Sequence, residues 1–170
     1  IGFGLGTALA GFPDSAARID GSLSEAERFE AVLGWMLSHY GFTRYRPGKA
    51  AVARALPVCP EGVDAALVLA MARGEFLTRD LINTPAQDMG PEELEAAFAG
   101  LAARFGAAVR VVRGDDLLTQ NFPMVHAVGR ASPRAPRIMD LRWGDAGPAL
   151  TLVGKGVCFD TGGLNIKPSS

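Results

Sequence analysis

The spacing of apolar residues in the second half of the chain switches repeatedly between a helical and a strand period. A helix is predicted from Pro91 to about Phe105, because proline suits a first helical turn and acidic residues follow it at the positive end of the helix dipole. We also predict a short helix at 115–120 and strands at Val109–Val112, Met124–Val128, Arg137–Trp143 and Leu150–Val153. Alternating elements of these lengths favour an α/β fold with a layered, partly parallel sheet flanked by helices.

Two helices are predicted in the first half of the chain. Ser24 and Glu27 have the spacing of a capping box, and apolar residues recur at helical intervals from there to about position 40. A longer helix is predicted from about Val63 to Ile82, ending before Pro85. At the start of the chain, the residues from Ile1 to Leu5 are predicted to be strand-like.

Several side chains have both a structural and a functional interpretation. Trp35, Phe42 and Tyr45 resemble a base-stacking set, but aromatic residues at such intervals are mostly core residues, and we predict a core role. Asn83 is interpreted as a helix end and turn rather than as a contact to an active site. His126 is interpreted as a hydrogen-bonded core residue rather than a metal ligand.

Composition excludes several classes of partner. The chain has 170 residues, of which 48% are hydrophobic and 21% charged, as in soluble globular proteins. Its formal net charge of −1 provides no basic surplus for nucleic acid or a membrane surface, and neither a secretory leader nor a membrane span is predicted. Cys59 and Cys158 are expected to be free thiols in a reducing cytosol.

A glycine-rich stretch near the end of the chain holds the candidate site. The strand predicted at 150–153 ends at Gly154, and Lys155, Asp160 and Lys167 follow it, where α/β folds commonly build their sites. By themselves these residues are as compatible with an exposed loop and a surface salt bridge. A nucleotide-binding loop would predict tight ATP binding, but the spacing of a phosphate-binding P-loop is absent.

Two motifs carry a resemblance to a known family. The stretch VGKGVCFDTGGLNIKPSS, at 153–170, resembles the active-site motif of the leucyl aminopeptidases, the M17 family of two-metal exopeptidases. RDLINTPAQDMGPEEL, at 79–94, is similar to the segment at the entry to that family's catalytic domain. The resemblance implies removal of N-terminal residues such as leucine from peptides, Zn²⁺ or Mn²⁺ as cofactors, and a cytoplasmic homohexamer.

The resemblance also assigns roles to three residues. It implies that Lys155 is a ligand to one metal, that Asp160 is a ligand shared by two metals, and that Lys167 is the catalytic lysine that polarises the scissile carbonyl. These residue types suit the chemistry. A lysine amine binds a metal only when it is neutral, and a dication that carboxylates already hold favours that form.

The resemblance further implies a domain organisation. GFTRYRP, at 41–47, is similar to the segment that closes the family's amino-terminal domain, and prolines punctuate the residues after it. We therefore predict the tail of an amino-terminal domain at 1–48, a linker at 49–61 and the first part of the catalytic domain at 62–170. A short apolar piece at 51–58 is a candidate strand.

The family pattern also contains residues that this chain does not show. Further acidic ligands and an arginine, in an N-T-D-A-E-G-R-L motif, are expected after Lys167 and do not follow it here. We therefore expect the 170 residues to be part of a longer aminopeptidase chain and to be inactive alone. The alternative is a non-catalytic oligomerising or binding module, and a gene that continues past Ser170 into that motif would favour the enzyme.

Overall fold

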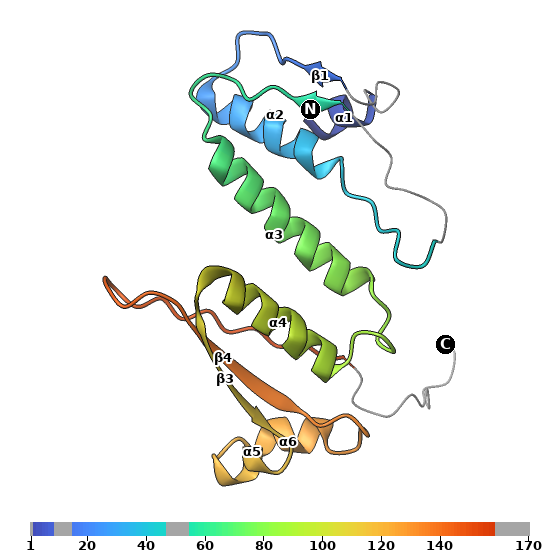
Figure 1. Ribbon diagram of the computed structural model, residues 1–170, viewed down its shortest axis with the longest axis vertical. Coiled ribbons are helices and arrows are strands. Elements are labelled where there is room, and N and C mark those ends of the chain that lie inside the picture. The colour runs from blue at the N-terminus through green and yellow to red at the C-terminus, as the bar shows by residue number, and fades with distance from the viewer. Residues whose placement is uncertain (1, 9–14, 47–54, 159–170) are drawn as a thin grey trace, which may run out of the picture. The chain divides into compact units, whose positions relative to one another are not determined.

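The computed structural model describes residues 2–8, 15–46 and 55–158. The chain divides into two compact units, residues 1–83 and 84–170. Each unit combines helices with a two-stranded sheet, which confirms the predicted α/β class (Figure 1). The predicted domain division, with a linker at 49–61, stays a prediction.

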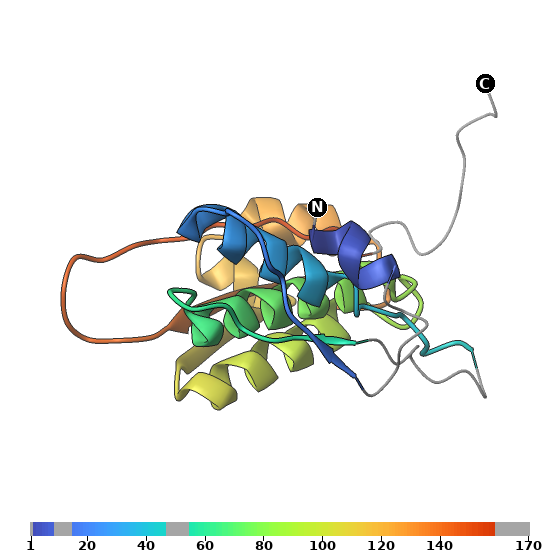
Figure 2. The same cartoon turned by 90° about the horizontal axis from the view of Figure 1, so that it is seen from above.

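The first unit carries three helices and a short parallel sheet. Its described elements are α1 (Gly2–Ala8), β1 (Ala16–Ala17), α2 (Glu25–Leu37), β2 (Leu56–Pro57) and α3 (Ala65–Asn83). β1 and β2 run side by side and in parallel (Figures 1 and 2). Of the candidate strand at 51–58, only β2 is strand among the described residues, and positions 51–54 lie outside them.

The predicted capping box starts α2. The Ser24 hydroxyl accepts a hydrogen bond from the Glu27 backbone N–H at 3.3 Å, and the Glu27 carboxylate accepts one from the Ser24 N–H at 2.8 Å. The Glu27 carboxylate also accepts a hydrogen bond from the Ser24 hydroxyl at 2.6 Å, and this bond, followed by the one from the Ser24 N–H, holds the pKa of Glu27 below its ordinary value. Farther along α2, Trp35 is 1% exposed, and its indole N–H donates to the Ala55 carbonyl oxygen at 2.9 Å, which ties the helix to the segment before β2.

The first described residues form a helix, so the strand predicted from Ile1 to Leu5 is wrong. Gly2 and Gly6 are four residues apart and therefore lie on one face of α1, and both are buried against α2. A Cβ at Gly2 would clash with the Ala31 carbonyl, and one at Gly6 would clash with Ser38 and Trp35. Close packing of the two helices explains why glycine occupies these two positions.

Hydrogen bonds join the ends of α2 and α3. The Tyr40 hydroxyl donates to Asp80 at 2.9 Å, and the Asn83 amide donates to the same hydroxyl at 2.9 Å. Partial burial is the main reason that the pKa of Tyr40 is raised. α3 ends at Asn83, as its interpretation as a helix end predicted.

The predicted aromatic core is confirmed only in part. Trp35 is a core residue, whereas Phe42 is half-buried and Tyr45 is 46% exposed. Phe42 and Tyr45 contact each other, with ring centroids 5.8 Å apart, in the segment after α2. The aromatic spacing therefore predicted the core role of Trp35 correctly, but not that of Phe42 and Tyr45, which lie beyond the end of the helix.

The second unit packs a helix on an antiparallel sheet. Its described elements are α4 (Pro91–Phe105), β3 (Ala108–Arg113), α5 (Asp116–Thr119), α6 (Pro123–Gly129) and β4 (Arg137–Arg142). β3 and β4 pair in antiparallel register, with Val112 opposite Ile138. Val112, Leu117 and Ala102 are its buried apolar residues among those described. Among the described strands, the parallel pairing expected for the sheet is therefore found only between β1 and β2.

Two of the predicted strands are wrong. Residues 124–128 lie in helix α6, which has Pro123 in its first turn, and a short apolar run does not by itself distinguish a strand from a helix. Residues 150–153 lie in a loop, where Leu152 is 86% exposed and Val153 is 92% exposed. A strand needs a partner for its backbone groups, and within the described part of the chain this run pairs with neither β3 nor β4.

The described residues bear on two further predictions, that the cysteines are free thiols and that no segment spans a membrane. Cys59 and Cys158 are both free, as expected. No helix in the described part of the chain has the length and apolar character needed to span a membrane.

The capping box yields a test of stability. We expect Ser24→Ala to lower the free energy of unfolding by about 1 kcal/mol, because the Glu27 N–H loses its acceptor. Urea unfolding followed by circular dichroism measures the change. Ser22→Ala, two residues earlier and outside the cap, is the matched control and should change stability little. Equal losses in the two variants would contradict the role of the cap.

Candidate active site

Lys155 lies in an exposed loop. Residues 149–157 are all exposed, and Lys155 has no hydrogen bond or ion pair within the described part of the chain. The turn that leads into this loop contains Gly144 and Gly147, whose φ values of 78° and 85° are readily adopted only by glycine. The Lys155 amine is therefore accessible to a ligand, although no strand delivers it.

The structure leaves the rest of the predicted site untested. Asp160 and Lys167 lie outside the described residues. Among the residues that are described, no group of three or more His, Cys, Asp or Glu side chains could hold a metal ion. Lys155 and Asp160 are residue types that can bind a divalent metal. The described residues supply no further ligand beside Lys155, and none of them forms a hydrogen bond or ion pair with its amine.

Beyond Lys155 the loop returns to the surface of the second unit. A Cβ added at Gly156 would lie 3.4 Å from the Leu94 side chain of α4, in ordinary van der Waals contact. Cys158 is half-buried, and burial, followed by the negative charge of Glu93, raises the pKa of its thiol. The segment after Lys155 therefore passes along the first turns of α4.

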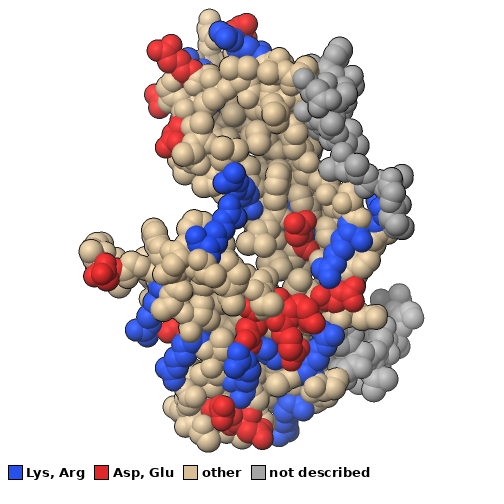
Figure 3. Space-filling model, viewed as in Figure 1, with Lys and Arg blue, Asp and Glu red and all other residues tan. Residues whose placement is uncertain are grey.

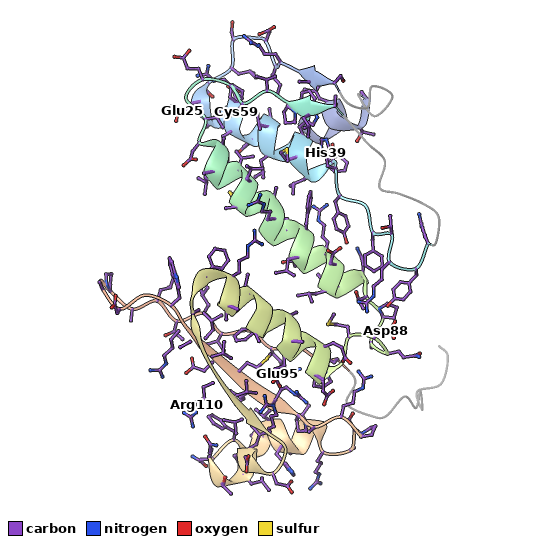
Figure 4. All side chains as sticks on the ribbon, in the orientation of Figure 1. Glu25, His39, Cys59, Asp88, Glu95 and Arg110 are labelled. Carbon is purple, nitrogen blue, oxygen red and sulfur yellow. The ribbon has the colours of Figure 1, made fainter. Side chains whose placement is uncertain are left out.

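A network of charged side chains surrounds those turns. Glu95 accepts hydrogen bonds from Arg113 of β3, one of them 2.9 Å long, and from Arg137 of β4 at 2.5 Å. Arg137 also pairs with Glu92 at 2.5 Å, and its side chain is only 7% exposed. Acidic and basic side chains are therefore interspersed in this unit (Figure 3). Figure 4 labels Glu95 on helix α4 and Arg110 on strand β3.

A second ion pair holds the segment that precedes α4. Arg134 donates to the Glu93 carboxylate at 2.9 Å and to the Gln87 carbonyl oxygen at 2.9 Å. Glu93 also accepts a hydrogen bond from the Gly90 N–H at 2.9 Å, and a Cβ at Gly90 would clash with the Arg134 guanidinium. The 84–90 segment, which carries part of the second family motif, is thereby fixed to the loop before β4.

Sequence reasoning identified the acidic residues of this network but missed the arginines. The glutamates at the start of α4 were interpreted through the helix dipole alone. In the structure they pair with Arg113, Arg134 and Arg137, which lie 18 to 45 residues away in the chain. The register of β3 against β4, which places Arg113 opposite Arg137, brings these two side chains together, whereas Arg134 lies in the loop before β4.

His126 has a structural partner. Its Nε2 lies 3.1 Å from the Asp115 carboxylate at the start of α5, and the His126 side chain is 17% exposed. The residue lies in α6 rather than in the predicted strand and is half-buried rather than in the core, but this contact is consistent with its interpretation as a hydrogen-bonded residue.

Comparison with known proteins identifies the family. Residues 76–170 match the model of the cytosol aminopeptidase family, catalytic domain. A probable cytosol aminopeptidase of Corynebacterium efficiens is 33% identical over 95% of this chain, and peptidase B of Pectobacterium carotovorum is 43% identical over 54% of it. The chain belongs to the cytosol aminopeptidase family.

Solved structures agree with this assignment. The cytosol aminopeptidase of Coxiella burnetii has a TM-score of 0.73 and 33% identity, over 85% of this chain and 31% of that one. The bottromycin maturation enzyme BotP, solved in complex with Mn, has a TM-score of 0.66 and 27% identity, over 83% of this chain and 33% of that one. This chain spans 33% of the C. efficiens relative and 23% of peptidase B, hence a third or less of their length.

The charge network predicts a sensitivity to acid. Hydrogen bonds from Arg113, supported by Arg137, lower the pKa of Glu95 to about 2 from its ordinary value of 4.5. A carboxyl group with a lowered pKa stabilises the folded state above its unfolded pKa, and this stabilisation is lost as the pH falls from about 4.5 toward about 2. At pH 7, Glu95→Gln should cost about 2 kcal/mol, because two arginines lose a charged acceptor.

The pH profile distinguishes this effect from a general loss of stability. Urea unfolding at pH 7 and at pH 3 should show a larger acid-induced loss in the wild type than in Glu95→Gln. Glu75→Gln is the control, because its exposed pair with Arg79, 3.5 Å apart on α3, is expected to be worth little. Parallel pH profiles for the wild type and Glu95→Gln would contradict the prediction.

Proposed function

We propose that the chain is part of a two-metal aminopeptidase that removes N-terminal residues, leucine and similar apolar ones, from peptides. The observation that carries the proposal is the match of residues 76–170 to the aminopeptidase catalytic domain, because that range contains Lys155, Asp160 and Lys167. The accessible position of the Lys155 amine is compatible with a role as a ligand.

Each of the three residues has a distinct task in this proposal. Lys155 and Asp160 bind the metal pair, Zn²⁺ or Mn²⁺, with Asp160 shared between the two ions. When bound, such a pair supplies an activated water and stabilises negative charge on the substrate. Lys167 places its positive charge beside the carbonyl oxygen of the scissile bond, where negative charge develops during attack.

The proposal extends to cofactor, location and assembly. A manganese-bound relative, BotP, supports the use of a divalent metal. The names of the curated relatives, cytosol aminopeptidases, support a cytoplasmic location. Assembly as a homohexamer is proposed from the family resemblance alone.

Alanine substitutions of Lys155 and Lys167 are expected to have different effects on metal content and activity. In the full gene product, Lys167→Ala should leave the metal content nearly intact and lower kcat by about 10²- to 10³-fold, as for loss of a single oxyanion-hole donor. Lys155→Ala should instead lower metal affinity, because a ligand is lost. Metal analysis by mass spectrometry and hydrolysis of a leucyl amide decide the point. Equal metal loss in the two variants, or full activity of Lys167→Ala, would show that the roles are misassigned.

Asp160 is predicted to be a ligand of both metal ions. If its carboxylate is shared, Asp160→Ala in the full gene product should empty the metal site rather than remove one ion. Metal analysis after dialysis is the measurement, and Asp145→Ala, in the exposed turn that leads to the Lys155 loop, is the matched control. Two equivalents of metal retained by Asp160→Ala would overturn the assignment. Wild-type protein that binds no metal would favour the non-catalytic alternative.

A further inference from the structure

A cavity in the first unit lies at the carboxyl ends of its parallel strands. Residues 18–21, directly after β1, and residues 58–61, directly after β2, line it together with Arg28 of α2, and its volume is about 300 Å³. Because β1 and β2 run in parallel, their carboxyl ends open on the same side, a place where α/β proteins commonly bind ligands. Cys59, which lines the cavity, lies at the same end of α2 as Glu25 (Figure 4).

Arg28 lines the cavity, and one atom of its guanidinium group lacks a partner. The Nε of Arg28 is buried and makes no hydrogen bond within the described part of the chain. A buried N–H without an acceptor is costly, and such an exception in a folded protein needs an explanation other than a structural hydrogen bond. The start of α2 itself needs no ligand, because Ser24 and Glu27 already cap it.

The other charged groups of the cavity are also unpaired. Arg18, Asp20 and Glu61 line it together with Arg28, and none of the four has an ion pair among the described residues. Guanidinium groups suit a carboxylate, because their N–H donors match its two oxygens. Asp20 and Glu61 disfavour a multiply charged phosphate and would accept hydrogen bonds from an ammonium group.

We propose that this cavity binds a free apolar amino acid. Its carboxylate would pair with Arg28 and Arg18, and its ammonium group with Asp20 or Glu61. Ile19, Val58 and Pro60 provide the apolar part of the lining. A volume of about 300 Å³ is at the lower end of the range for small-molecule sites. The inference goes beyond the proposed function and does not depend on it.

Calorimetric titration with four probes tests the ligand chemistry. Leucine should bind, whereas 3-methylbutylamine, which lacks the carboxylate, and 4-methylpentanoate, which lacks the ammonium group, should each bind at least about tenfold more weakly, because each loses one set of charged hydrogen bonds. Inorganic phosphate should bind more weakly than leucine. Phosphate or 4-methylpentanoate binding as tightly as leucine would overturn the proposal, since the site would then be a simple anion site.

Variants test the location. Arg28→Met should weaken leucine binding at least about tenfold, whereas Arg73→Met, on the exposed side of α3 outside the cavity, should not. The thermal midpoint of Arg28→Met should be unchanged or higher, because the change removes a buried, unpaired donor; a purely structural arginine would give a lower midpoint. If Arg28→Met does not fold, the exposed Arg18→Met provides the same binding test.

If leucine binds at the candidate active site instead, the two variants Lys155→Ala and Arg28→Met should affect its binding in the opposite way. As a reaction product there, it would be lost in Lys155→Ala and retained in Arg28→Met, which would overturn the cavity proposal and leave the proposed function intact. Loss in Arg28→Met with retention in Lys155→Ala supports the cavity, whatever the outcome of the activity measurements.

Discussion

The carboxylate of Glu95 joins helix α4 to both strands of the second unit. It lies on α4 and accepts hydrogen bonds from Arg113 at the end of β3 and from Arg137 at the start of β4. Few apolar side chains in the described part of this unit are fully buried, so its packing relies on this charged contact more than is usual for a small α/β layer. The orientation of α4 on the sheet therefore depends on an ion pair.

Such a contact has requirements that an apolar core does not have. The Arg137 side chain is 7% exposed and Glu95 17%, so both charges lose much of their hydration and need good hydrogen-bond geometry in return. Glu92 supplies a second acceptor to Arg137, and Arg113 supplies donors to both oxygens of Glu95. The network thus satisfies its members together, and loss of the Glu95 carboxylate leaves Arg113 without its acidic partner and Arg137 with Glu92 alone.

What could be predicted from the sequence follows the distinction between local and long-range information. The Ser24 cap, α3, α4 and β3 depend on neighbouring residues, and each was predicted close to its observed position. α1 was missed because its glycines make sense only against α2, and α6 because a short apolar run does not define its own period. For the candidate site, the family motif predicted Lys155 as a metal ligand. The pairing of Arg134 with Glu93 could not be predicted, because it joins residues 41 positions apart in the chain and no local pattern encodes such a contact.

The position of Lys155 depends on what holds the two ends of its loop. Residues 149–157 are exposed and bury little apolar surface of their own, so the loop has no core to define its path. On one side it follows β4 and the turn with Gly144 and Gly147; on the other, Gly156 reaches Leu94, between the two glutamates that bind Arg134 and Arg137. Since Glu93 and Glu95 fix α4 on either side of Leu94, the charged network also fixes the surface on which the loop rests. Its influence on Lys155 is therefore indirect: it passes through the backbone of α4 and needs no contact with the amine.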